Sequence, residues 1–474
     1  MDKRQAAPWI AANKFGLGLR PNERAAIASD PRGWLKAQLS QVAVMPPALL
    51  PFADSPALLL EGRELQLRLS ELGKRALEPG VKEQQAQIRK TIAERQEEQQ
   101  KARLLAAIDS EAPFAERLVR FWSNHFTVVA GGGGTKDLLR HIAVPYENEA
   151  IRSNLDRSFA ELLLAVEQHP AMLIYLDNHS SVGPNSKTGI AQKKGLNENL
   201  ARELLELHTL GVDGGYGQED VTALARILTG WGVDLRTGLT PDKYGSTLPG
   251  TYRFALVHHE PGEHTVLGRT YAVPGEQRGE EALRDLAHHP STARHIARKL
   301  VRHFVADDPP PEAVEKIERV FLETGGWLPA VHGALIELEQ AWDPQYRKLK
   351  SPEDLVISVA RGCMLPGRSE QPQLVLRSLN QALKTFGQTP FNAGSPAGWA
   401  DTAAAWGNPD AILKRIQWFT ALTKLIPAGL DPLQLAQELL PPHDALLTEL
   451  KRAESEQQGL VLLFGSPSFQ WRGV

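Results

Sequence analysis

Apolar side chains recur every three or four residues through most of this sequence, which is the spacing of one face of an α-helix. The clearest example is the set Phe114, Leu118, Phe121, Trp122 and His125. Prolines and glycines separate the segments that have this spacing. We therefore expect an all-α, multi-helical globular fold. The predicted helices cover residues 22–42, 56–77, 81–109, 112–125, 157–167, 171–177, 197–210, 218–231, 280–288, 291–306, 311–324, 328–342 and 353–363, with about four more after residue 370.

One stretch departs from helical spacing. In residues 251–273, Tyr252, Phe254 and Leu256 alternate with polar residues, and this period of two is typical of a strand. Pro261-Gly262 then provides a turn before a second β-prone run. We expect a small β-hairpin insertion in the otherwise helical fold.

Composition divides the chain into four parts. Residues 56–110 are rich in Leu, Glu, Gln, Lys and Arg, and Glu78-Pro79-Gly80 interrupts them, which predicts a charged helical hairpin arm. The second helix of this arm has only a thin apolar stripe, so the arm either projects into solvent or contacts a partner. We expect an N-terminal helical segment (1–55), this arm (56–110), a helical core (111–365) and a C-terminal helical part (366–474).

Charge and cysteine content narrow the class of protein. The formal net charge of −3 gives no reason to expect a nucleic-acid partner. No stretch approaches about 18 apolar residues, so we expect no membrane span. Without an apolar run of the length of an export signal, we expect a cytoplasmic protein, or alternatively a periplasmic one exported with a partner. The single cysteine, Cys363, excludes an intrachain disulfide, and its apolar neighbours predict a packing role.

The densest cluster of chemically active side chains lies on the predicted helix 197–210. At about 100° per residue, five polar side chains share one side of this helix. They are Glu198, Asn199, Arg202, Glu203 and Glu206. Carboxylates arranged in this way can ligate a hard metal ion or act as an acid–base pair. The alternative is a solvated face on which the arginine bridges two glutamates one turn away.

Three histidines are candidate metal ligands. His125 and His208 both lie on apolar faces of their helices, so each is either a hydrogen-bonded core residue or an inward-pointing ligand. If the two meet, a metal ion or a polar core network joins them. His259 belongs to a turn rich in His and Glu at residues 257–264. That turn is either an exposed polar segment or a transition-metal site, and its spacing matches no zinc motif.

The predicted helix 291–306 is strongly basic. Arg294, Arg298 and Arg302 follow one another at intervals of four residues, and the helix contains no acidic residue. Such a row either clamps a phosphate or carboxylate, docks on the acidic helix, or forms a cationic surface.

A series of motifs, in order along nearly the whole chain, resembles one family. They are residues 13–18 (NKFGLG), 121–126 (FWSNHF), 169–178 (HPAMLIYLDN), 197–211 (NENLARELLELHTLG), 228–231 (LTGW), 259–262 (HEPG), 267–268 (LG), 390–392 (PFN) and 398–399 (GW). Together they are similar to the uncharacterised bacterial family catalogued as domain of unknown function 1800. The resemblance implies a helical fold, a bacterial source, and association with a second, often exported family similar to sulfatase-like or phosphatase-like proteins.

The polar residues within these motifs are the reason to expect a shared site. Asn124, Asp177 and Trp231 lie in them beside the acidic helix and the three histidines, and we assign them, with Asn199, to substrate binding. Near the turn the chain departs from the family pattern, since Glu260 stands where relatives tend to have Asp. This departure leaves only His259 with an expected role there.

Two functions from different classes follow. The first is a metal-assisted, hydrolase-type enzyme in which the three glutamates bind a divalent metal or transfer protons. The arginine would then hold an anionic group, and the histidines would complete the shell. The second is a non-enzymatic binding or assembly protein that works with a second exported protein. In that case the polar motifs form a structural network, and the arm at 56–110 contacts the partner.

Overall fold

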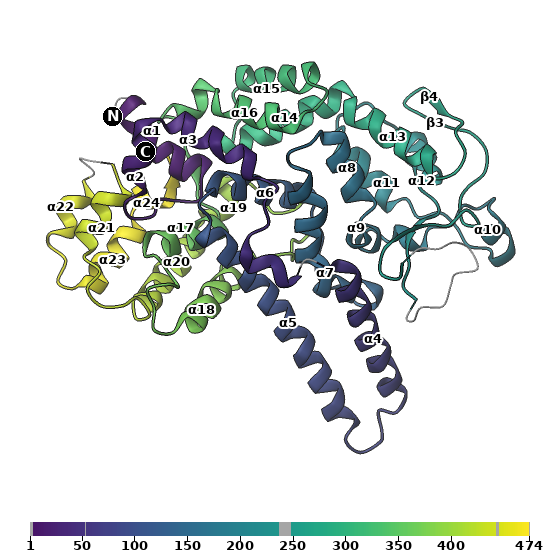
Figure 1. Ribbon diagram of the computed structural model, residues 1–474, viewed down its shortest axis with the longest axis horizontal. Helices are drawn as coiled ribbons and strands as arrows, with labels where there is room; N and C mark the ends of the chain where they lie inside the picture. The colour runs from purple at the N-terminus through teal and green to yellow at the C-terminus, as the bar shows by residue number, and fades with distance from the viewer. Residues whose placement is uncertain (1–2, 53, 237–247, 442–444, 474) are drawn as a thin grey trace.

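Helices make up most of the fold, and this confirms the all-α prediction (Figure 1). The computed structural model describes residues 3–52, 54–236, 248–441 and 445–473. No helix in these ranges is both long and apolar enough to cross a membrane. The α-helices are α1 (Lys3–Ile10), α2 (Glu23–Ser29), α3 (Pro31–Gln38), α4 (Ser55–Lys74), α5 (Val81–Asp109), α6 (Pro113–His125), α7 (Leu139–Tyr146), α8 (Phe159–Glu167), α9 (Pro170–Tyr175), α10 (Lys187–Gln192), α11 (Asn199–Glu203), α12 (Gln218–Ile227), α13 (Glu276–His288), α14 (Pro290–Phe304), α15 (Pro311–Glu323), α16 (Leu328–Ile336), α17 (Pro352–Gly362), α18 (Pro372–Thr385), α19 (Ala403–Trp406), α20 (Pro409–Leu422), α21 (Pro432–Leu439), α22 (Leu446–Leu450), α23 (Glu456–Gly465) and α24 (Pro467–Gln470).

Short strands form three separate antiparallel pairs in the described residues. The strands are β1 (Trp231–Val233), β2 (Tyr252–Phe254), β3 (His264–Val266), β4 (Arg269–Tyr271), β5 (Lys348–Leu349) and β6 (Trp471–Arg472). The pairing is β1 with β2, β3 with β4, and β5 with β6. The last pair brings the end of the chain against residues 348–349, so that Arg472 reaches the interior.

The predicted hairpin at 251–273 is only partly correct. β3 and β4 do form a hairpin, but its turn is Leu267-Gly268, where both residues have positive φ, and not Pro261-Gly262. β2 pairs instead with β1, so that Trp231 lies opposite Phe254. The alternating pattern identified a strand, but its partner lies 20 residues upstream, where the sequence was read as the end of a helix.

Helix α6 lies in the centre of the core. A single hydrophobic cluster extends from Ala6 to Phe469, and it includes the predicted apolar face of α6. The opposite face of α6 is also buried, so Arg117 and Arg120 are only 2% and 9% exposed. Buried guanidinium groups need partners, and these two lie beside the cavity described below.

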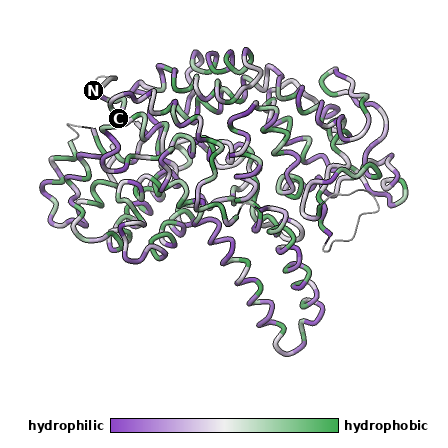
Figure 2. The backbone as a smooth tube through the Cα atoms, viewed as in Figure 1, coloured by the Kyte–Doolittle hydropathy of each residue, from purple (hydrophilic) through white to green (hydrophobic). Residues whose placement is uncertain are grey.

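The arm formed by α4 and α5 projects from the body of the molecule (Figure 1). Figure 2 shows that hydrophilic residues cover much of it, with hydrophobic residues interspersed. Leu72, Val81 and Ile88 form a small cluster of their own near its tip. At its base, Gln99 donates to the carbonyl of His141 across 3.0 Å, which ties α5 to α7.

The predicted helices differ from those in the structure in several places. Residues 22–42 are divided at Asp30, whose side chain caps α3 by accepting from the Gly33 N–H. Residues 197–210 begin as α11 but continue as a π-helical turn, Leu204–His208. The part after residue 370 contains the short helices α19, α22 and α24 besides four longer ones, because helices of four or five residues have too little periodicity to be recognised.

Candidate active site in a central cavity

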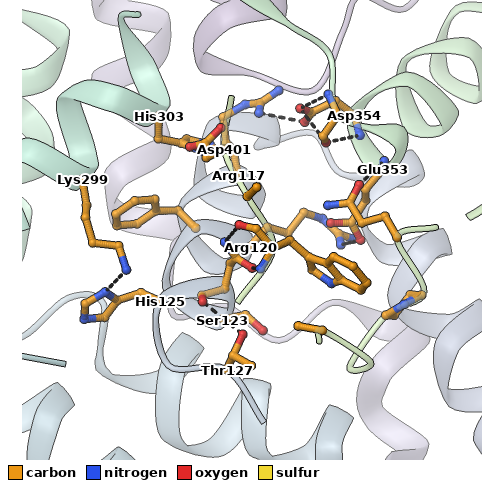
Figure 3. A pocket seen from close by; sticks show the side chains of 18 of the residues that line it. Arg117, Arg120, Ser123, His125, Thr127, Lys299, His303, Glu353, Asp354 and Asp401 are labelled. Carbon is orange, nitrogen blue, oxygen red and sulfur yellow. Dashed lines mark hydrogen bonds and ion pairs between the residues drawn. The ribbon is translucent and has the colours of Figure 1, made fainter. Parts of the chain in front are cut away.

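A cavity of about 340 Å³ lies against α6, and we call it the central cavity (Figure 3). α5, α6, α14, the start of α17, residues 388–402 and β6 all contribute to its wall. Six of its described lining residues are cationic and three are carboxylates. They are Arg103, Arg117, Arg120, Lys299, Arg302 and Arg472, against Glu353, Asp354 and Asp401. The wall therefore has an excess of positive charge.

The carboxylates at the start of α17 pair with some of these cations. Glu353 receives hydrogen bonds from Arg103 and, at 2.6 Å, from Arg120. Asp354 pairs with Arg117 at 2.8 Å and with Arg472. Burial raises the pKa of Asp354, but Arg117 and Arg472 outweigh that effect and hold the pKa below its ordinary value. Each carboxylate thus serves two arginines, and further acceptors lie outside the cavity wall: Arg103 also pairs with Glu147, and Arg120 also donates to the Arg103 carbonyl.

Several donors in the cavity wall lack acceptors. The Nε atoms of Arg120 and Arg472 are buried and have no hydrogen-bond partner among the described residues. Buried guanidinium N–H groups without acceptors are costly, and an oxyanion is the group that satisfies them best. The two unpartnered donors are therefore a reason to expect an anionic ligand.

Lys299 reaches the cavity from α14 and meets His125 from α6 (Figure 3). Its Nζ lies 2.8 Å from His125 Nδ1, and Nε2 of the same ring lies 3.2 Å from the His208 carbonyl oxygen. A carbonyl only accepts, so Nε2 carries the proton and Nδ1 is the acceptor for the lysine. Burial, and secondarily Lys299, lower the pKa of His125 well below its ordinary value, which keeps the ring neutral.

Burial also lowers the pKa of Lys299, to about 8; Asp401 raises it and Arg302 lowers it further. In the described part of the chain Lys299 makes no ion pair, and His125 is its hydrogen-bond partner. With a pKa of about 8, roughly a tenth of this side chain is uncharged amine at pH 7, far more than for an ordinary lysine.

His303 lies one turn beyond Lys299 on α14 and also lines the cavity. Its Nδ1 lies 2.7 Å from Oδ2 of Asp401, which comes from the segment before α19. The carboxylate accepts from Nδ1–H, and this leaves Nε2 as the basic nitrogen. Burial lowers the pKa of His303, while Asp401 raises it. A neutral imidazole oriented by a carboxylate is suited to general base catalysis.

Asn124 and His125, together with Arg302 of the basic helix, are residues proposed from the sequence that line this cavity. Asn124 also fixes the loop that closes one side, since its amide donates to the Trp399 carbonyl at 3.0 Å and accepts from the Trp399 N–H at 2.7 Å. His208 does not line the cavity but supports it, because its carbonyl holds His125 and its Nδ1 lies 2.7 Å from Oε1 of the buried Glu167. The two histidines therefore meet through a polar network.

The acidic helix lies outside the central cavity. Arg202 bridges back to Glu198 at 3.2 Å, and Glu198 also accepts from Thr222 and Gln218. The Thr222 and Gln218 hydrogen bonds are the main reason that the pKa of Glu198 is lowered. This cluster matches the solvated-face alternative, although no ion pair joins Arg202 to Glu206 in the described residues.

The other polar residues of the acidic helix lie apart from the hydrogen bonds around Glu198. Asn199 is exposed. Glu203 is partly buried, and burial is the main effect that raises its pKa. Glu206 also raises this pKa, whereas His208 lowers it. Glu206 accepts weakly from the Tyr216 hydroxyl at 3.5 Å. The π-helical turn moves Glu206 away from the position that uniform α-helical spacing gives it.

Asp177, Trp231 and His259 also lie away from the central cavity. Asp177 pairs with Lys136 at 2.8 Å. Trp231 is buried. His259 Nδ1 lies 2.7 Å from the Thr229 carbonyl oxygen. The structure therefore spreads the proposed substrate-binding residues over several places.

The three candidate metal ligands do not come together. His125 uses both ring nitrogens in the contacts above, and Nδ1 of both His208 and His259 is also engaged. Within the described ranges, no group of three or more His, Cys, Asp or Glu side chains is placed to hold a metal ion. The donor set of the residues that the structure describes thus does not fit the proposed divalent metal.

Sequence reasoning missed most of the central cavity. The basic helix was recognised, but the anion clamp was assigned to Arg294, Arg298 and Arg302. Arg294 pairs with Glu318 of α15, and Arg298 is exposed, so of these three only Arg302 reaches the cavity. Lys299 and His303 lie on the same basic helix, so its sequence could have indicated them as site residues. No feature of the sequence indicates Asp401 and Arg472, because only the folded chain brings them to α14.

Comparison with known proteins identifies the chain. The model of the family described as "Protein of unknown function (DUF1800)" matches residues 10–471, so the chain belongs to that family. No curated protein and no solved structure matches it. The function must therefore be argued from the central cavity itself.

Proposed function

We propose that this member of the DUF1800 family is an enzyme that binds a small oxyanionic substrate in the central cavity and acts on it by general acid–base catalysis. The observation that carries the proposal is the excess of cationic over acidic side chains in the wall, combined with the unpartnered Nε atoms of Arg120 and Arg472. A carboxylate, phosphate or sulfate group supplies the missing acceptors. The volume of about 340 Å³ suits a small molecule.

The acid–base groups of the proposal are His303 and Lys299. His303 is oriented by Asp401, and both His303 and Lys299 line the cavity where the anion would bind. A histidine held by a carboxylate contributes to hydrolase-type and related proton-transfer reactions alike. We place this chemistry in the central cavity rather than on the acidic helix, whose glutamates are separated and in part already engaged by neighbouring polar groups. The divalent metal assigned to that helix has no part in this proposal.

Anion binding is measured by titration calorimetry with inorganic phosphate and with malonate. We expect the protein to bind at least one of them, and Lys299→Met to weaken binding about tenfold or more, the size expected for loss of a charge-assisted hydrogen bond. Arg298→Met is the matched control, because Arg298 lies next to Lys299 on α14 but is exposed. Absence of binding by the wild-type protein, or equal weakening in both variants, would contradict the proposal.

Catalysis is then tested with a panel of small anionic esters and oxo acids. His303→Gln is expected to abolish turnover of any substrate that is found while leaving phosphate affinity within about threefold, because His303 serves proton transfer in the proposal rather than charge. Turnover that persists in His303→Gln would remove this residue from the mechanism.

An assembly role is the second candidate, and the projecting arm is the observation that favours it. α4 and α5 extend well beyond the body (Figure 1), and their tip packs only on itself. The partner implied by the resemblance is a sulfatase-like or phosphatase-like exported protein. If the arm is the contact, replacing residues 69–88 with a short flexible linker abolishes co-purification of the coexpressed partner. Unchanged co-purification would exclude the arm.

A further inference from the structure

We infer that Lys299 is a nucleophile that forms an imine with a carbonyl group of the substrate, so that the substrate is an oxo acid. Here an oxo acid means an aldehyde or ketone that also carries a carboxylate or phosphate. This inference rests on the proposed function, since the same cavity must hold the anionic group. It adds a covalent role for one side chain and narrows the substrate class.

The first support is the environment of the Lys299 amine. Its hydrogen-bond partner is the Nδ1 atom of His125, which is 2.8 Å away and belongs to a neutral ring. In the described residues no carboxylate lies within ion-pair distance of Nζ, although Lys136, Lys348 and other lysines have such partners. Lys299 is only partly exposed and has no counter-ion among the described residues; a lysine in such surroundings exists partly as free amine, and its lowered pKa agrees.

The second support is the way the amine is oriented. The His208 carbonyl fixes the proton on His125 Nε2, so the lone pair of Nδ1 must accept from the lysine. A neutral amine has two hydrogens and one lone pair. With one N–H directed to His125, the other hydrogen and the lone pair remain available to a ligand in the cavity. His125 is thus a positioning residue for the nucleophile.

The third support is the set of groups around Lys299. Arg302 lies three residues further along α14, and Arg120 enters from α6, so cationic groups are present for the anionic end of an oxo acid. His303 is one helical turn from Lys299 and is held by Asp401, so a proton carrier lines the same cavity as the amine. An arrangement that only bound an anion would not require the histidine–carboxylate pair.

The reaction is balanced without an oxidant or reductant. The Lys299 nitrogen forms a bond to the carbonyl carbon, and the carbonyl oxygen takes up a proton to become a hydroxyl. The carbon–oxygen bond then breaks, and both hydrogens of the neutral amine leave with the oxygen as water. His303 can accept the first proton from nitrogen and return it to the leaving oxygen. One amine and one carbonyl give one imine and one water.

The test is reductive trapping with two probes, pyruvate and dihydroxyacetone phosphate, in the presence of sodium borohydride. The two probes distinguish a carboxylate from a phosphate as the anionic group. We expect one reduced adduct per chain by intact-mass spectrometry with at least one probe, peptide mapping to place it on Lys299, and slower trapping when inorganic phosphate competes. Peptide mapping of the wild-type protein keeps the test valid if a variant fails to fold.

Variants separate the nucleophile from the charge. Lys299→Arg keeps a cation but has no nucleophilic amine, so the adduct should vanish; Lys136→Arg, which changes a lysine paired with Asp177, should label like wild type. No adduct with either probe, or equal labelling of Lys299→Arg, overturns the inference. If phosphate or malonate still binds in that case, the proposed function stands without the imine. If neither binds to wild type, the proposed function fails as well.

Discussion

Nδ1 of His208 lies 2.7 Å from Oε1 of Glu167, and their side chains are only 1% and 0% exposed. This contact joins the end of α8 to the π-helical turn, and the carbonyl of the same histidine holds His125 beside the central cavity. A buried polar pair of this kind is costly to break, because the partner left behind is buried without a hydrogen bond. The position of Lys299 therefore depends on a pair that does not itself line the cavity.

Replacing Glu167 with alanine should destabilise the protein strongly. We expect Glu167→Ala to lower the free energy of unfolding by about 3 kcal/mol, since it leaves a cavity and an unpaired His208 in the core. Glu206→Ala is the matched control. Glu206 is only partly buried and has one weak contact, so its loss should cost less than about 1 kcal/mol. Urea denaturation measures both, and similar values for the two variants would show that the buried pair contributes little.

Local periodicity predicted much of the fold, because the formation of each of these elements depends mainly on residues that are close in sequence. α4, α5, the apolar face of α6 and the inward direction of His208 all follow from spacing alone. Glu206 shows where that method ends. Glu206 lies within a π-helical turn, Leu204–His208, whose wider spacing moves its side chain from the face that uniform α-helical spacing gives it.

The candidate site required information that spacing does not contain. Lys299 and His303 are one turn apart, so their common face could be predicted from the sequence. Their partners His125 and Asp401 are 174 and 98 residues away. The sequence of a helix does not show whether a charged face such as that of α6 is buried or exposed to solvent. Arg117 is buried only because α17 and β6 pack against it in the folded chain.

Two buried lysines predict an unusual dependence of stability on pH. Burial lowers the pKa of Lys14 and of Lys350 from 10.5 to about 7 in the folded protein. Between about pH 7 and pH 10 the unfolded chain therefore binds more protons than the folded one, and the free energy of unfolding rises with pH. The upper limit is about 1.4 kcal/mol per pH unit for each lysine. Guanidinium denaturation at pH 7, 8 and 9 should show this increase.

Lys350→Met should flatten this rise. Lys350 lies over the Phe469 ring at 3.9 Å, so methionine can retain the apolar contact without a titrating group. Lys14 is less suitable, because its amine donates to the carbonyls of Ala341 and Tyr346. A slope in Lys350→Met equal to that of wild type would mean that this lysine does not titrate in the range.

Asp354 predicts the opposite behaviour in acid. Its pKa in the folded protein is held below the ordinary value: burial raises it, but Arg117 and Arg472 lower it more. The stability that it contributes is thus present above the pKa of an unfolded aspartate and is lost progressively as pH falls from about 5 down through the lowered folded-state pKa. We expect Asp354→Asn to be destabilised by about 3 kcal/mol at pH 7, with a smaller further loss in acid than wild type. Parallel acid-denaturation curves for the two proteins would contradict this.

Two glycine-to-alanine substitutions should change stability in opposite directions. A Cβ at Gly279 in α13 would lie 2.5 Å from Cζ2 of Trp231, which is itself only 1% exposed. We expect Gly279→Ala to cost about 1–3 kcal/mol through overpacking. At Gly73, near the end of α4, a Cβ would meet nothing within 4 Å. Gly73→Ala should therefore stabilise the arm by up to about 1 kcal/mol through helix propensity alone.

Hydrogen exchange distinguishes the two effects, because the tip of the arm packs only on itself. Gly73→Ala should slow exchange near Leu72 and leave the body unchanged, whereas Gly279→Ala should speed exchange in α13 and β1. If Gly279→Ala is as stable as wild type, Trp231 can shift its ring. Its burial would then reflect loose packing, and a site role for Trp231 would regain support over a purely structural one.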